Sequence, residues 1–186
     1  MSEHLRAEDV LKEIENEYTK LVSEARETIL KKLRLSDKAK RRGTVFLCLD
    51  NGRAYLSKPR NCKSYREVGL EEYISSVVEE EVKVWRTRLD GWRWLLTSCG
   101  EVLNKVATAF YATSRLLFFD GGSVSVIGIE KPIIVVSVSK CSKEVAAFLQ
   151  KLRESPHDVE VFVGSSLDPV TPEKALEICQ SLAANA

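Results

Sequence analysis

Aromatic and basic side chains alternate along one stretch of the chain, from Lys83 to Phe119. The members of this stretch are Trp85, Arg86, Arg88, Trp92, Arg93, Trp94, Phe110, Tyr111, Arg115, Phe118 and Phe119. Aromatic rings stack on the bases of single-stranded nucleic acid, and cations follow its phosphates. Arginine serves both roles, because its planar guanidinium also stacks. The pattern therefore predicts a site for single-stranded nucleic acid, whereas the competing interpretation is a Trp core beneath an Arg surface.

A basic segment lies just before this stretch. The whole chain has 28 basic and 27 acidic residues and a formal charge of +1, but residues 31–66 carry 12 basic and only 2 acidic side chains. Because salt screens charges beyond about 8–10 Å, a phosphate backbone responds to this local excess. A solvated face of a thermostable protein is the other explanation. The residues predicted to contact nucleic acid here are Lys38, Lys40, Arg41, Arg42, Tyr55, Lys58, Arg60, Lys63 and Arg66.

Motifs of the common enzyme classes are missing from the sequence. There is no G-x-x-x-x-G-K-[ST] loop and no G-x-G-x-x-G fingerprint. The two histidines, His4 and His157, do not accompany a nucleophile and an orienting acid, so no catalytic triad is indicated. We therefore expect a non-enzymatic protein without a cofactor. A small metal-dependent nuclease is a less favoured alternative, with the candidate acids Asp50, Glu79, Glu80, Asp120 and Glu130.

The five cysteines are too far apart for a zinc motif. Cys48, Cys62, Cys99, Cys141 and Cys179 follow one another at separations of 14, 37, 42 and 38 residues, so no C-x-x-C pair exists. We therefore predict no metal site. An odd count in an intracellular protein indicates buried free thiols, although hyperthermophile proteins also use intracellular disulfides. With one Met, two Gln and many charged residues, the composition is typical of a hyperthermophile.

The elements that position these side chains follow from hydrophobic periodicity and turn signals. Apolar residues recur at spacings of three and four from Ala7 to about Leu35, which predicts a long amphipathic helix. Asn51-Gly52 predicts a hairpin of Thr44–Asp50 with Arg53–Lys58, after which a basic loop extends to about Gly69. A helix is predicted from Leu70 to about Glu81.

The Trp residues are predicted to lie on a second hairpin. Asp90-Gly91 is another type I′ turn signal and would join a strand at Val82–Leu89 to a strand at Trp92–Thr97. The resulting register places all three Trp on one face and three Arg on the other. A helix at about Glu101–Ser114 is expected to follow.

The turn signals and apolar runs in the last third of the chain predict a third hairpin and a βαβα unit. The turn Asp120-Gly121-Gly122 and the helix start Thr171-Pro172 are its clearest signals. Gly164-Ser165-Ser166 is interpreted as a loop, with a backbone phosphate cradle as the alternative. The predicted elements are strands Arg115–Phe119, Ser123–Ile129, Ile133–Ser139 and Val159–Val163, helix Ser142–Arg153, and a helix after Thr171.

Together these elements predict an α+β or mixed α/β fold, in which antiparallel hairpins form a sheet packed with helices and a βαβα unit follows. We expect an N-terminal helix at 1–36, a nucleic-acid-binding region at 37–140, and C-terminal elements at 141–186 that share its core. No apolar run reaches 18 residues, and Met1–Arg6 lacks the apolar stretch of a signal peptide. The expected location is therefore the cytoplasm, with no membrane partner.

In its composition, its predicted hairpins and its Trp/Arg/Phe run at residues 84–119, the chain resembles the ThermoDBP single-stranded DNA-binding proteins of hyperthermophilic archaea and their related proteins. The likeness covers residues 40–140 and does not extend to the elements after Ile133. It implies an aromatic-lined cleft between a sheet and helices that takes single-stranded DNA, and assembly into oligomers.

The first functional hypothesis is thus non-catalytic binding of single-stranded nucleic acid, with DNA favoured over RNA, by a homo-oligomer. The alternative is a protein-interaction or assembly subunit of a nucleic-acid-processing complex. That alternative rests on the long N-terminal helix and on the succession of acidic and basic blocks along the chain.

Overall fold

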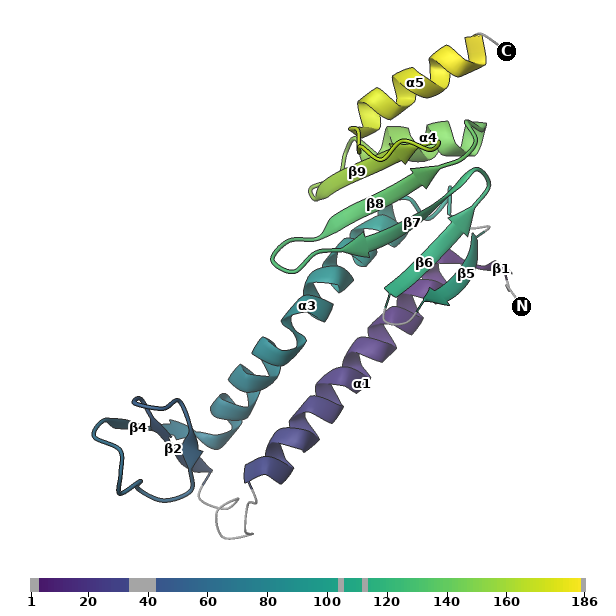
Figure 1. Cartoon of the computed structure of the whole chain (residues 1–186). Coiled ribbons are helices and arrows are strands. Elements are labelled where there is room, and N and C mark those ends of the chain that lie inside the picture. The colour runs from purple at the N-terminus through teal and green to yellow at the C-terminus, as the bar shows by residue number, and fades with distance from the viewer. Residues whose placement is uncertain (1–3, 34–42, 104–105, 112–113, 185–186) are drawn as a thin grey trace. The chain divides into compact units, whose positions relative to one another are not determined.

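Two compact units make up the chain in the computed structural model, which describes residues 4–33, 43–103, 106–111 and 114–184 (Figure 1). The sheet unit comprises residues 1–16 and 84–186, and the small unit comprises residues 17–83. Two long helices, α1 (Ala7–Leu33) and α3 (Leu70–Ser98), contribute residues to both units. Among the described residues, no helix combines the length and apolarity that a bilayer span requires.

A six-stranded mixed sheet, in the order β1-β5-β6-β7-β8-β9, forms the centre of the sheet unit. All neighbouring strands are antiparallel except β8 and β9, which run parallel and are joined through helix α4 (Lys143–Leu152). Helix α5 (Pro172–Ala184) follows β9 and lies beside α4. The strands are β1 (His4–Leu5), β5 (Val106–Tyr111), β6 (Ser114–Phe119), β7 (Gly122–Ile127), β8 (Ile133–Val138) and β9 (Asp158–Val163).

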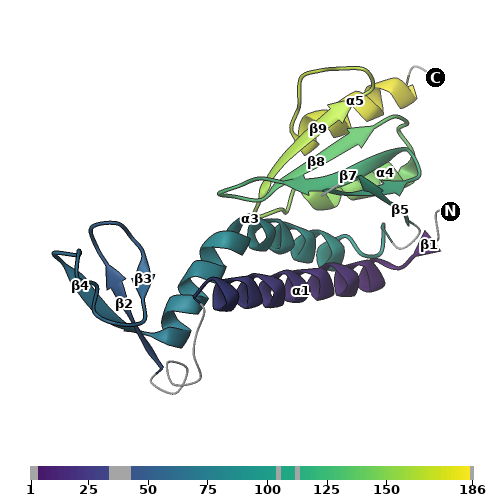
Figure 2. The same cartoon turned by 60° about the horizontal axis from the view of Figure 1, so that its bottom comes forward.

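One face of this sheet carries the core of the unit. A row of residues across β6 to β9 is fully buried, and it consists of Leu117, Val124, Val136 and Val161. Helix α3 packs on this face, because a Cβ added to Gly91 would stand 2.6 Å from Cγ1 of Val126. Helix α4 packs on the same face through Phe148, whose ring centroid lies 5.1 Å from that of Phe119. Figure 2 shows the α1 and α3 segments of this unit beneath the strands.

In the part of the chain that the structure describes, no helix covers the opposite face of the sheet (Figure 1). Side chains alternate between the two faces of a strand, so the register identifies the residues of this second face. Phe118 and Ile127 are each 40% exposed there. We call this surface the open face, and its residues on β6 to β9 are Leu116, Phe118, Ser123, Ser125, Ile127, Ile133, Val135, Ser137, Asp158, Glu160 and Phe162.

The small unit has its own sheet and its own core. Strands β2 (Thr44–Cys48), β3 (Ala54–Tyr55) and β4 (Tyr65–Gly69) form an antiparallel sheet in the order β3-β2-β4. Val45 from β2 is fully buried against the helix segments of this unit. The buried residues of that core are Ala25, Ile29, Val45, Leu70, Ile74, Val78 and Val82.

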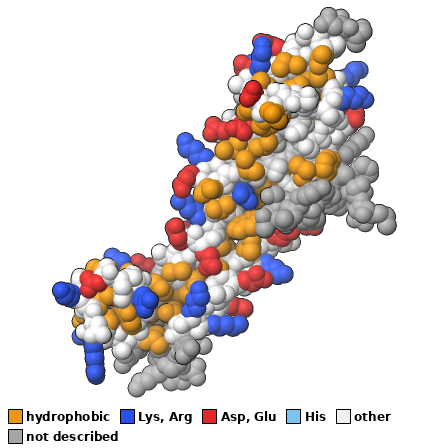
Figure 3. Space-filling view, in the orientation of Figure 1, with side chains coloured by type: hydrophobic (Ala, Val, Ile, Leu, Met, Phe, Trp, Pro, Cys, Tyr) orange, Lys and Arg blue, Asp and Glu red, His pale blue; other side chains and the backbone are white. Residues whose placement is uncertain are grey.

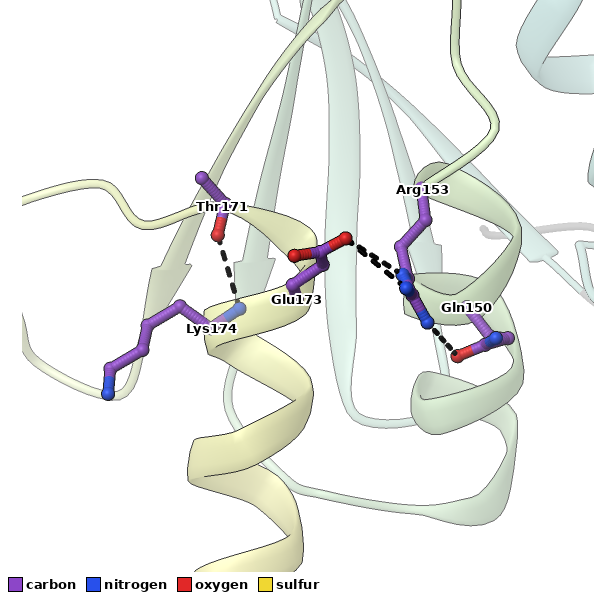
Figure 4. Close-up of polar contacts among 5 residues, drawn as sticks. All are labelled: Gln150, Arg153, Thr171, Glu173 and Lys174. Atoms are coloured by element: carbon purple, nitrogen blue, oxygen red, sulfur yellow. Dashed lines mark hydrogen bonds and ion pairs between the residues drawn. The ribbon is translucent and has the colours of Figure 1, made fainter.

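Polar contacts set the start of α5 and its place beside α4 (Figure 4). Oγ1 of Thr171 accepts a hydrogen bond from the backbone N–H of Lys174 at 3.2 Å, which caps the helix as the sequence predicts. Arg153 at the end of α4 donates to Oε1 of Glu173 at 3.3 Å and to Oε1 of Gln150 at 3.4 Å. The two helices are therefore joined by side chains at their facing ends.

The predicted fold class is confirmed, as are the long N-terminal helix, the first and third hairpins and the βαβα unit. The predicted hairpin of Val82–Leu89 with Trp92–Thr97 is wrong, because α3 continues through Asp90-Gly91 to Ser98. Apolar residues repeat at helical spacing on both sides of this dipeptide. Gly91 serves close packing on the sheet and not a turn.

Two further expectations are wrong for a non-local reason. The predicted helix at Glu101–Ser114 is replaced by strand β5, which pairs with β6. The predicted loop before Gly69 contains strand β4, which pairs with β2 along five residues. In both cases a strand partner elsewhere in the chain decided the conformation, and local periodicity does not reveal such a partner.

Replacing Gly91 with alanine should destabilise the sheet unit, although alanine favours a helix by about 1 kcal/mol over glycine. The added methyl group would stand 2.6 Å from Val126 and 3.0 Å from Cβ of Pro132, so helix and strand must separate. We expect a loss of about 1–3 kcal/mol in denaturant unfolding. Thr97→Ala, at an exposed position of the same helix, is the control. Equal or greater stability of Gly91→Ala would contradict this packing.

Candidate nucleic-acid interface

The three Trp residues do not form one surface, because they lie on a helix and not on a strand. Trp85 and Trp92 are seven residues apart and project from the same side of α3, whereas Trp94 projects from the opposite side. Trp92 is only 4% exposed, and the other two rings are half-buried. The predicted Trp face of a hairpin is therefore wrong.

Several of the predicted arginines contact other residues of the sheet unit. Arg115 is 8% exposed, and its Nη1 donates to Oε2 of Glu13 at 3.2 Å, which ties β6 to α1. Arg93 pairs with Glu15 at 3.6 Å. The guanidinium carbon of Arg88 lies 5.7 Å from the ring centroid of Trp85, within range of a cation–π interaction.

The remaining predicted residues of this stretch are dispersed. Arg86 is exposed on α3, and Phe118 belongs to the open face of the sheet. Phe119, its neighbour, packs against Phe148. Six predicted residues lie outside the residues or side chains that the structure describes, namely Lys38, Lys40, Arg41, Arg42, Phe110 and Tyr111.

The small unit brings aromatic rings together on the outward face of its sheet. The register places Phe46 opposite Tyr55 on β3, and it places Cys48 opposite Tyr65 on β4, so these side chains share one face. The rings of Phe46 and Tyr65 meet edge to face with centroids 5.8 Å apart. Tyr65 is 41% exposed, and Phe46 and Tyr55 are half-buried. We call Phe46, Tyr55 and Tyr65 the aromatic platform.

Exposed cations lie on β4 and on the connections of the small sheet, and Figure 3 shows Lys and Arg side chains beside hydrophobic ones over this unit. Within the described part of the chain, none of these cations has an ion-pair partner. They are Arg53, Lys58, Arg60, Lys63 and Arg66. One acid, Glu67, lies opposite Phe46 on the platform side and is exposed. The platform thus combines ring faces with positive charge and a single opposing carboxylate on its strands.

A disulfide and two hydrogen bonds hold the loop that carries three of these cations. Cys62 in the loop is bonded to Cys48 at the end of β2. The backbone N–H of Lys63 donates to Oδ2 of Asp50 at 2.7 Å, and that of Leu49 donates to the carbonyl of Ser64 at 2.9 Å. The loop is therefore fixed beside the aromatic platform.

The acids of the nuclease alternative are not gathered into one site. Among the described residues, the one cluster of three potential metal ligands contains Asp50 with Cys48 and Cys62. Glu79 and Glu80 lie on α3, whereas Asp120 and Glu130 lie in turns next to β7. In the phosphate-cradle alternative, two of the three backbone amides are already engaged, because those of Gly164 and Ser166 donate to carbonyls within the fold.

In the comparison with known proteins, no protein-family model, curated protein or solved structure matched this chain. The candidate interface therefore rests on its own geometry. Phe46, Tyr65 and Arg53 belong to it, although the aromatic and basic patterns of the sequence did not predict them. Phe46 and Tyr55 share a face through the first hairpin, whereas Tyr65 joins them only through the pairing of β4 with β2.

The cysteines are mostly bridged in the described chain. Cys48–Cys62 and Cys141–Cys179 are disulfides, and Cys99 is free and buried. Burial raises the pKa of the Cys99 thiol from 9.0 to about 12. The charge of Lys151 lowers this pKa by a smaller amount, and the charge of Glu154 raises it slightly.

The free energy of unfolding should fall as pH rises from 9 towards 12, in part because of Cys99. The unfolded chain releases the thiol proton from pH 9.0 upward, whereas the folded chain keeps it up to about pH 12. The contribution is thus complete below pH 9 and is lost above it. Cys99→Ala lacks this ionisation, so its stability difference from the wild type should shrink across the window. A difference independent of pH, measured by denaturant unfolding, would contradict the raised pKa.

Proposed function

We propose that the small unit binds single-stranded nucleic acid, with DNA favoured over RNA, on the aromatic platform. One observation carries the proposal: three rings share the outward face of the small sheet, and exposed cations lie on the connections of the same sheet. An outward sheet face in water ordinarily carries polar side chains. Rings at such positions need another reason, and stacking on bases supplies one.

The energetics of stacking suit this arrangement. A base stacked on an aromatic side chain contributes about 1–3 kcal/mol and does so for any base. Tyr65 has the most exposed ring of the platform, and its contact with Phe46 holds the ring in place. A ring that is already oriented loses less conformational entropy on binding. Tyr65 is therefore the expected principal stacking residue.

The charge distribution supports the same surface. The described residues 43–69 carry five basic and two acidic side chains, and the sequence of residues 34–42 adds five basic and one acidic residue. Phosphates bound by these cations release counterions, so the affinity should fall steeply with salt concentration. The exposed carboxylate of Glu67 opposes phosphate binding from within the same sheet.

Two substitutions should change the affinity for fluorescent oligo-dT in opposite directions. Tyr65→Ala removes a stacking ring and should weaken binding by about 5- to 150-fold. Glu67→Gln removes a repelling charge and should strengthen binding, most clearly at low salt. Fluorescence polarisation at several salt concentrations measures both effects.

A control outside both proposed surfaces separates this site from exposed apolar side chains in general. Leu167, in a loop of the sheet unit, is 91% exposed against 41% for Tyr65, and Leu167→Ala should leave the affinity for oligo-dT unchanged. Oligo-rU of equal length tests the preference for DNA. No polarisation change with tens of micromolar protein at low salt would overturn the proposal.

A second candidate function, self-assembly, rests on the open face of the sheet unit. Strands β6 to β8 present no charged side chain there, whereas β9 adds Asp158 and Glu160 at one edge. In a two-fold contact the same patch meets itself, and an uncharged patch does so without repulsion. A second copy of this chain is therefore the favoured occupant. The apolar stripe of α1 is not a competing surface, because Val10 and Ile29 are buried.

A charge placed on the open face tests self-assembly. Ile127→Lys should reduce the mass measured by light scattering towards the 20.9 kDa of one chain. Ser165→Lys, in an exposed loop, adds the same charge elsewhere and should leave the mass unchanged. A wild-type chain that is already monomeric at high concentration would contradict this candidate.

A further inference from the structure

We propose that Cys48, Asp50 and Cys62 form a site for Zn²⁺, or for a similar borderline divalent cation, when the Cys48–Cys62 disulfide is reduced. The two sulfurs and a carboxylate oxygen of Asp50 lie within 4.8 Å of one another. No other three His, Cys, Asp or Glu side chains gather in this way in the described ranges. This inference does not depend on the proposed nucleic-acid binding.

The donor set suits zinc in number and kind. Zn²⁺ prefers four tetrahedral ligands, and cysteine thiolates and carboxylates are among its usual donors. Neighbouring donor atoms in such a site are roughly 3–4 Å apart. Once the bond between the two sulfurs is broken, they can separate to this spacing. Three protein ligands leave the fourth position for water.

Backbone hydrogen bonds hold the two cysteines near each other independently of the disulfide. The N–H of Cys48 donates to the carbonyl of Arg53 at 2.9 Å, within the first hairpin. The N–H of Leu49 donates at 2.9 Å to the carbonyl of Ser64, two residues after Cys62. Strand β4 continues this pairing with β2. Reduction therefore leaves both thiols at the same corner of the small sheet.

Asp50 is oriented for the third ligand position. Its Oδ2 accepts the hydrogen bond from the N–H of Lys63 at 2.7 Å, next to Cys62, and this bond fixes the carboxylate. Such a second bond to a ligating carboxylate is a common support of metal sites. Cys48 is buried, Cys62 is half-buried and Asp50 is exposed, so a cation and its water ligand would enter from the Asp50 side.

The redox step that opens the site is a thiol–disulfide exchange. A dithiol reductant gives two electrons and two protons to the Cys48–Cys62 bond, which becomes two thiols, and the reductant becomes a disulfide. Binding of Zn²⁺ then releases the two thiol protons, because the metal takes thiolates. The disulfide and the metal are thus alternative states of one corner of the small sheet.

Cobalt provides a spectroscopic test on the full-length chain. Co²⁺ bound by thiolates shows sulfur-to-metal charge-transfer bands and strong visible bands of a tetrahedral site. The chain reduced with an excess of dithiothreitol, which is then removed without oxygen, should bind one Co²⁺, and Zn²⁺ should displace it. The oxidised chain should bind none. Failure of the reduced chain to bind Co²⁺ would overturn the proposal.

Variants assign the site to these residues. Asp50→Asn retains both thiols and should lower the Co²⁺ affinity at least about tenfold. Replacing Cys141 and Cys179 with serine removes the other bridge and should leave Co²⁺ binding intact. Binding that survives Cys48→Ser with Cys62→Ser would overturn the assignment. Circular dichroism of each variant controls for folding, and Asp50→Asn keeps the test decisive if the double variant does not fold.

Discussion

The close approach of α3 to strand β7 at Gly91 is the constraint on which the sheet unit depends. A side chain at this position would collide with Val126, so only glycine lets the helix lie directly on the strand. Because α3 continues unbroken through this point, Leu89, Trp92 and Leu96 are buried. The sequence predicts a turn at Asp90-Gly91 and a stacking surface that includes Trp92. In the structure, Gly91 and Trp92 are instead part of the buried core.

The basic residues of the two units have different surroundings. In the sheet unit, Arg115 and Arg93 are paired with acids of α1, and Arg88 lies over a Trp ring. In the small unit, Lys58, Arg60 and Lys63 are exposed on the loop that the Cys48–Cys62 disulfide ties to the end of β2. A paired arginine is held by its own carboxylate partner, whereas an exposed cation is available to a phosphate. Because of this difference, we assign the proposed nucleic-acid binding to the small sheet and not to the Trp residues.

The Cys48–Cys62 corner shows how one local geometry can support two proposals. As a disulfide it fixes the loop that carries cations beside the aromatic platform, and as two thiols with Asp50 it offers a metal site. The spacing of 14 residues between these cysteines fits no zinc motif in the sequence. The β2–β4 pairing brings them together, with Cα atoms 5.9 Å apart.

The sequence by itself determined the α+β class, the long first helix, the hairpin at Asn51-Gly52 and the C-terminal βαβα unit. Each of these follows from local periodicity or from a turn or cap whose partners are a few residues away. Only the tertiary structure decided that Asp90-Gly91 lies within a helix and that residues 106–111 and β4 are strands. An Asp-Gly pair fits either a tight turn or a helix that packs closely on a strand, and an edge strand exists only beside its partner. The aromatic platform depends on such a strand, because Tyr65 joins Phe46 and Tyr55 only when β4 pairs with β2.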